Sequence, residues 1–264
     1  MIAAIQWAPD PDLLCLGTFC IKWYGACWVM AIISGYYHGI NFFTHEKKDI
    51  GKVVSLVQHL FLGGFLGARL GEFLFYSPEL LVSDPIQFFY FRNGGMSSHG
   101  GFLGVCIAIA LFVRKNPEFT YLWILDRMAV AGASIVVLMR IGNLINSELS
   151  GTPTTLPWGF LFVLIEENPI PRHPVVLYEA IAYTILWGVY VWLYSKGFGK
   201  KNGLLSAVFL TTLVPSRIIL ECFKTSDQAL WMHLSRTQWL SVPLVVAGLL
   251  WFIYILKTKD RALS

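Results

Sequence analysis

The chain has 264 residues, of which 56% are hydrophobic and only 14% are charged. Soluble domains carry about 25% charged residues, so this composition excludes an ordinary water-soluble protein and indicates an integral membrane protein. The formal net charge of +4 is small and the lysines fall in short loops, so we expect no nucleic-acid partner.

Seven apolar segments of spanning length follow one another along the chain. A helix that crosses a bilayer needs roughly 20 apolar residues. The segments are 23–43, 53–76, 98–113, 121–140, 174–195, 203–222 and 238–256. The polar, proline-containing stretch 141–173 is predicted to form a small extracytoplasmic cap. Because no internal repeat is evident, we expect one all-α polytopic membrane domain over residues 1–264 with about seven transmembrane helices.

The positive charges between these segments predict the orientation of the chain. Eleven Lys and Arg residues follow the first, third, fifth and seventh spans, whereas five lie in the N-terminal segment and the alternate loops. Cytoplasmic loops carry the excess of Lys and Arg. The N-terminus is therefore predicted to lie outside and the C-terminus in the cytoplasm.

The five cysteines show no CxxC and no spacing typical of metal ligands. We therefore expect no metal and no cofactor. Cys27 and Cys106 lie in helical patterns and are interpreted as small core residues. A disulfide between Cys15 and Cys20 on the outer face is possible.

Polar side chains from all seven predicted spans fall within the depth of the outer leaflet. Ionisable groups at membrane depth are costly and tend to mark function. The pattern predicts a polar cavity that opens toward the outer face. The residues are Tyr24, Arg69, Glu72, His99, Arg140, Asn143, Tyr178, Glu179, Arg217, Glu221 and Gln238.

Arginine suits a phosphate ligand because its planar fork donates two parallel hydrogen bonds. Arg140, Asn143 and Ser147 are spaced i, i+3 and i+7, so they would share one face if the helix continues through them. No acid lies three or four residues from Arg140, so a ligand or a distant partner is expected. For the other two arginines, intrahelical ion pairs are an alternative: Arg69–Glu72 and Arg217–Glu221.

His99 begins the third span beside several glycines. An imidazole has an unperturbed pKa near 6.5 and can act as a general base. Glycines let a lipid or a second backbone approach closely, and their spacing is also typical of helix packing. They are Gly100, Gly101 and Gly104 after His99, and Gly63, Gly67 and Gly71 on the second span.

Several short motifs follow one another in a fixed order. They are Lys22-Trp23-Tyr24-Gly25, Gly67-Ala68-Arg69-Leu70-Gly71, His99-Gly100-Gly101, Arg140-Ile141-Gly142-Asn143 through Asn146 and Glu148, Pro171-Arg172-His173-Pro174 with Leu177-Tyr178-Glu179, Arg217-Ile218-Ile219 with Glu221, and Gln238-Trp239-Leu240. Over nearly the whole chain, these motifs resemble the bacterial prolipoprotein diacylglyceryl transferases.

The resemblance implies a multi-pass enzyme of the bacterial cytoplasmic membrane whose active site faces the outer leaflet. Members of the family take phosphatidylglycerol and a preprolipoprotein whose signal peptide ends in a lipobox cysteine. They attach the diacylglyceryl group to the cysteine through a thioether and release glycerol phosphate.

The resemblance also implies roles for individual residues. His99, Arg140 and Arg217 are expected to be catalytic: His99 accepts or relays the thiol proton, and the two arginines hold the phosphate. Asn143 and Glu148 orient the head group or Arg140. Tyr24 is a further lipid-binding residue by its match to the family motif. Expected supporting residues are Arg69, Glu72, Asn146, Glu179 and Gln238.

Two other classes of protein could gather polar groups between helices. A lipid or solute transporter would do so, although usually near the midplane and with repeated halves. A scaffold without catalysis would leave the locally unpaired Arg140 and the glycine-flanked His99 unexplained.

Overall fold

A computed structural model describes residues 4–90, 95–148, 151–225 and 234–260. The chain divides into two compact units. The first unit comprises Met1–Tyr37 and Asp126–Ser264, and the second comprises His38–Leu125. Each unit is described by itself below.

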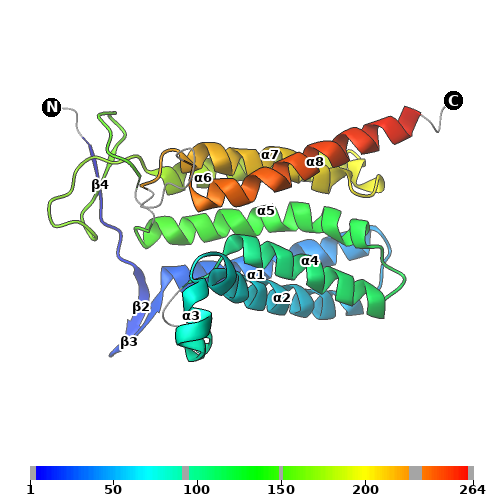
Figure 1. The fold of residues 1–264 in the computed structure, drawn as a ribbon, viewed down its shortest axis with the longest axis horizontal. Helices are drawn as coiled ribbons and strands as arrows, with labels where there is room; N and C mark the ends of the chain where they lie inside the picture. The colour runs from blue at the N-terminus through cyan, green and yellow to red at the C-terminus, as the bar shows by residue number, and fades with distance from the viewer. Residues whose placement is uncertain (1–3, 91–94, 149–150, 226–233, 261–264) are drawn as a thin grey trace. The chain divides into compact units, whose positions relative to one another are not determined.

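Seven long helices account for most of the described residues (Figure 1). They are α1 (Trp23–His45), α2 (Gly51–Phe75), α4 (Ser98–Lys115), α5 (Tyr121–Ile145), α6 (Val175–Ser195), α7 (Leu204–Glu221) and α8 (Arg236–Asp260). Within the described ranges, six helices, all except α1, are long and apolar enough to cross a membrane. The shortest, at 18 residues, measures about 27 Å, close to the thickness of the hydrocarbon core. The chain is therefore a multi-pass membrane protein, as the composition predicts.

The prediction of an all-α fold missed four short strands: β1 (Ile5–Trp7), β2 (Asp12–Leu16), β3 (Phe19–Lys22) and β4 (Phe160–Phe162). In the first unit, β1 pairs in parallel with β4, so the N-terminal segment joins the stretch predicted to form the cap (Figure 1). The indole Nε1 of Trp7 donates to the carbonyl of Leu144 at 2.9 Å. The predicted boundary of 141–173 was also wrong, because α5 continues to Ile145.

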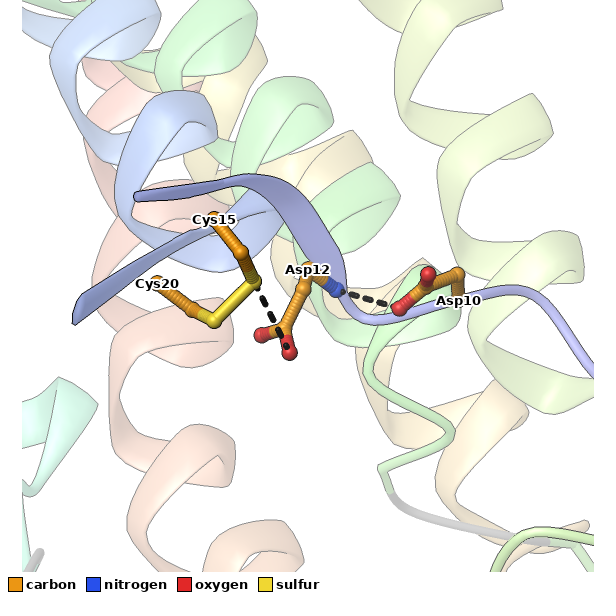
Figure 2. Close-up of a disulfide and its surroundings, with 4 residues drawn as sticks. All are labelled: Asp10, Asp12, Cys15 and Cys20. Atoms are coloured by element: carbon orange, nitrogen blue, oxygen red, sulfur yellow. Dashed lines mark hydrogen bonds between the residues drawn. A yellow bond between two sulfur atoms is a disulfide. The ribbon is translucent and has the colours of Figure 1, made fainter. Parts of the chain in front are cut away.

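Strands β2 and β3 form an antiparallel hairpin directly before α1. Cys15 and Cys20 face each other across the hairpin with their Cα atoms 4.1 Å apart, and their sulfurs form a disulfide (Figure 2). The backbone N–H of Trp23 donates to the carbonyl of Pro11 at 3.0 Å. The hairpin is thereby fixed to the first turn of α1.

In the second unit, α2 and α4 pack through glycines. A Cβ atom added at Gly67 would lie 2.5 Å from the carbonyl oxygen of Gly100, and one added at Gly63 would lie 2.6 Å from that of Gly104. Real Cβ atoms do not approach a carbonyl oxygen so closely. The helix-packing interpretation of these glycines is therefore confirmed.

In the first unit, α5 is fixed to the start of α7 by a buried carboxylate. Asp126 is 0% exposed and accepts hydrogen bonds from Gly203 N at 2.7 Å, Ser206 N at 2.9 Å and Ser206 Oγ at 2.6 Å. These donors belong to the first turn of α7, where backbone N–H groups lack intrahelical acceptors and a negative charge is favourable. Asp126 therefore acts as a cap supplied by another helix.

Candidate functional site

Arg140 lies one turn before the end of α5, with its side chain 12% exposed. Its Nε is 3.0 Å from Oε2 of Glu179 on α6, and its Nη1 donates to Oδ1 of Asn143 at 3.3 Å. The expectation of a distant partner for Arg140 is thus confirmed. The two contacts hold the guanidinium from two sides, through Nε and through Nη1.

A short chain of amides and a carboxylate continues from Arg140. Asn143 Nδ2 donates to Oε2 of Glu148 at 2.5 Å, and Asn146 Nδ2 donates to the other carboxylate oxygen, Oε1. The backbone N–H of Glu148 also donates to the carbonyl of Asn143 at 2.9 Å. Both polar atoms of the Asn143 side chain are therefore hydrogen-bonded: Oδ1 accepts from Arg140, and Nδ2 donates to Glu148.

The turn after α5 brings Glu148 back toward the helix. Ser147 has a φ of +54°, in the left-handed region that few residues other than glycine adopt. Because α5 ends at Ile145, the helix does not continue through Ser147, and only Asn143 shares a helical face with Arg140. The reversal of the chain at Ser147 brings the Glu148 carboxylate within hydrogen-bonding distance of Asn143.

Glu179 on α6 is a fully buried carboxylate between two cations. Its Oε2 faces Arg140, and its Oε1 accepts from Nζ of Lys224 at 2.8 Å. The same Nζ lies 3.1 Å from Oε2 of Glu221 at the end of α7. A buried charge needs such partners because its desolvation is otherwise very costly.

Arg217 on α7 has a buried Nε that has no hydrogen-bond partner among the described residues. Its predicted intrahelical partner, Glu221, pairs with Lys224 instead. The hydroxyl of Tyr183 is buried and lies within electrostatic reach of Arg217, Arg140 and both glutamates. Arg140 on α5 and Arg217 on α7 therefore lie within electrostatic range of the same hydroxyl on α6, and the two arginines are grouped here on that basis with the glutamates.

Two further predicted residues lie on the first unit. The ring of Tyr24, in the first turn of α1, lies 3.3 Å from the position of a Cβ added at Gly142, two residues after Arg140. Gln238, near the start of α8, donates from Nε2 to the carbonyl of Ile218 on α7 at 3.1 Å. Tyr24 thus lies next to the arginine-bearing turn, and Gln238 connects α8 with α7.

The second unit carries His99, Arg69 and Glu72. His99 is the second residue of α4 and is partly exposed, in a turn that begins with the hydrogen bond from Gly100 N to Ser97 Oγ.

Arg69 is buried in α2, and its guanidinium donates to four backbone carbonyls. The acceptors are Gln87, Phe88, Tyr90 and Gly95. Arg69 therefore holds the segment that contains α3 (Pro78–Ser83) and the 3-10 helix η1 (Pro85–Phe89) against α2.

One group of residues within the described part of the chain has the spacing of metal ligands: Asp12, Cys15 and Cys20. The two sulfurs are joined in a disulfide (Figure 2). They consequently offer no thiolate, the form in which cysteine binds metals.

Lys224 was not predicted as a site residue, because in the sequence it is one of the charges in the loops between the predicted spans. Its position three residues after Glu221 is the signal that could have indicated a pair. Its contact with Glu179, 45 residues earlier, has no local signal.

The six apolar helices and the buried cluster of arginines, carboxylates and amides define a multi-pass membrane protein with a polar site between its helices. The family model described as "Prolipoprotein diacylglyceryl transferase" matches residues 11–254. The chain belongs to this family, and the predicted resemblance is confirmed.

Relatives with the name phosphatidylglycerol–prolipoprotein diacylglyceryl transferase are similar along almost their whole length. The protein from Chloroherpeton thalassium is 38% identical over 249 residues, covering 93% of this chain and 92% of its own. That from Tolumonas auensis is 38% identical over 258 residues, covering 97% and 98%. That from Porphyromonas gingivalis is 38% identical over 268 residues, covering 95% and 94%.

Proposed function

We propose that this chain transfers the diacylglyceryl group of phosphatidylglycerol to the lipobox cysteine of a preprolipoprotein. It belongs to the family named for this transfer, and the three relatives bearing the name match it along more than nine tenths of both chains. The observation that supports the residue roles is the partly buried guanidinium of Arg140, held by Asn143 and Glu179 within electrostatic range of the same tyrosine hydroxyl as Arg217.

The reaction is a displacement at carbon. The cysteine sulfur attacks the glycerol carbon that carries the phosphate, so a C–S bond forms and the C–O bond to the phosphate breaks. The electron pair of the broken bond passes to the phosphate oxygen, and glycerol phosphate leaves with increased negative charge. The thiol proton must be removed, because the thiolate is the nucleophile.

The two arginines bind the phosphate and stabilise the charge that develops on it. Positive groups that are already in place cost no reorganisation during the reaction. The ion pair with Glu179 and the hydrogen bond to Asn143 fix the orientation of Arg140. Glu148 and Asn146 act through Asn143, and Tyr24 lines the same turn.

His99 accepts the thiol proton. An imidazole can act as a general base, and His99 lies partly exposed in the first turn of α4. Arg69 supports this unit through its hydrogen bonds to the carbonyls of Gln87 and Gly95, while Glu72 lies on the next turn of the same helix.

The chain forms one polytopic domain of seven spans, with α1 as the seventh, and the N-terminus lies outside. α1 has 23 residues, enough to cross the hydrocarbon core. Three observations support the orientation: the excess of Lys and Arg in the alternate loops, the disulfide, and the pairing of the N-terminal strand with residues 160–162. The site consequently faces the outer leaflet of the bacterial cytoplasmic membrane.

A reconstituted assay tests the function. The purified protein is placed in vesicles that contain phosphatidylglycerol labelled in the head-group glycerol, together with a lipobox peptide or the same peptide with serine in place of cysteine. We expect release of labelled glycerol phosphate with the cysteine peptide alone. Release without a thiol, or none from the folded protein with either peptide, would refute the proposal.

A further inference from the structure

Lys224 is a third cation of the site, and the chain around it holds it in place. Its side chain is 9% exposed, and its Nζ contacts Oε1 of Glu179 at 2.8 Å and Oε2 of Glu221 at 3.1 Å. Its backbone forms a bridge with Gly151, and the preceding carbonyl, of Phe223, accepts from Thr152 N at 2.8 Å. Lys224 is therefore fixed on both its backbone and its side chain.

The carboxylate of Glu179 is shared between two cations. One oxygen faces Nε of Arg140 at 3.0 Å and the other faces Nζ of Lys224 at 2.8 Å. Because Glu179 is fully buried, water does not screen either interaction. Negative charge on Glu179 that Lys224 does not neutralise therefore acts directly on Arg140.

The balance of charges shows what Lys224 contributes. In their ordinary charge states, the cluster has three cations and, with Glu148 beyond Asn143, three carboxylates, so it is neutral before an anionic ligand binds. The residues are Arg140, Arg217, Lys224, Glu148, Glu179 and Glu221. Without the lysine, the cluster has one net negative charge and repels a phosphate.

We propose that Lys224 is a positioning residue of the transferase: it neutralises Glu179, so that Arg140 keeps its positive charge for the phosphate of the lipid. Its Nζ contacts two carboxylates, so it acts through Glu179 and Arg140. This inference rests on the proposed phosphate-binding role of Arg140.

The test compares kcat and KM for phosphatidylglycerol in four variants. Lys224→Met is expected to lower kcat at least about 50-fold, because the departing phosphate gains negative charge in the transition state. Lys224→Arg, which keeps the charge, is expected to stay within about fivefold of wild type. Lys196→Met removes an exposed lysine at the end of α6 and is expected to leave kcat unchanged.

The double variant Lys224→Met/Glu179→Gln separates charge balance from a purely structural role. It removes one cation and one carboxylate and restores the net charge of the wild-type cluster, so we expect at least a tenfold recovery of kcat over Lys224→Met. It also leaves no unpaired Glu179 charge, so it remains informative if the single variant does not fold. A folded double variant with no activity would overturn the inference.

Failure of the inference can be distinguished from failure of the proposed site by measuring Arg140→Ala in parallel. If Arg140→Ala is inactive while Lys224→Met keeps the wild-type kcat, only the role of Lys224 is refuted. If Arg140→Ala retains full activity, the proposed site itself is refuted.

Discussion

Exchanging a donor for an acceptor at Asn143 should disable the enzyme, although the change is isosteric. Asn143 Nδ2 donates to Glu148 Oε2 at 2.5 Å, while Oδ1 accepts from Arg140. Asn143→Asp places a carboxylate oxygen where the donor was. At 2.5 Å and an effective dielectric constant of about 20, two carboxylates repel by roughly 7 kcal/mol.

The variant can avoid this repulsion by rotating the new side chain, and the hydrogen bonds lost in that rotation set the expected loss of kcat/KM. Turning the new carboxylate away from Glu148 loses the hydrogen bonds to Glu148 and Arg140. Hydrogen bonds to charged groups contribute about 1.5–3 kcal/mol each. We therefore expect a loss of about 3 kcal/mol or more in transition-state stabilisation, which corresponds to about a hundredfold in kcat/KM.

A second substitution should restore the hydrogen bond with its direction reversed. In Asn143→Asp/Glu148→Gln, the new amide donates to the new carboxylate, and the retained Oε1 still accepts from Asn146. We expect kcat/KM of the double variant to exceed that of Asn143→Asp at least tenfold. The assay is diacylglyceryl transfer to a lipobox peptide, with thermal unfolding in detergent to verify the fold. Wild-type kcat/KM for Asn143→Asp, or no recovery in the double variant, would refute this reasoning.

Two further predictions concern the helix packing that supports the site. Gly67→Ala places a Cβ atom 2.5 Å from a carbonyl oxygen of the facing helix, so it should destabilise the protein by about 1–3 kcal/mol in thermal unfolding. The control, Gly132→Ala, meets no atom within 4 Å and should be neutral or stabilising, and equal effects of the two would contradict the packing interpretation. Asp126→Ala removes the acceptor of three buried hydrogen bonds, at about 1–3 kcal/mol for each unsatisfied donor. Asp126→Asn retains one acceptor oxygen, so its thermal unfolding midpoint should lie between those of wild type and Asp126→Ala. A midpoint of Asp126→Ala equal to that of wild type would show that α7 does not depend on this cap.

The long helices could be predicted from the sequence because each apolar run is continuous and of spanning length. The short strands could not, since β1 and β4 have three residues each and pair across more than 150 positions. The end of α5 was also predicted too early, at Arg140, because the polar residue Asn143 lies inside the helix rather than after it.

Arg140, Arg217 and Asn143 could be predicted because polar residues in an apolar segment are visible in the sequence. Glu179 could be recognised as a polar residue, but its pairing with Arg140 depends on how α6 packs against α5. Lys224 lies beyond the end of α7, where a lysine is ordinarily a solvated loop residue, so only the structure shows that it contacts Glu179.

The role of Arg140 is tested by the rate of transfer by Arg140→Ala in vesicles that contain phosphatidylglycerol labelled in its acyl chains. We expect a kcat at least about a hundredfold below wild type, because a preorganised group that stabilises developing negative charge is lost. The variant should still fold, because Lys224 remains to neutralise Glu179. A folded Arg140→Ala enzyme that transfers the label at the wild-type rate would contradict the central claim that Arg140 holds the departing phosphate.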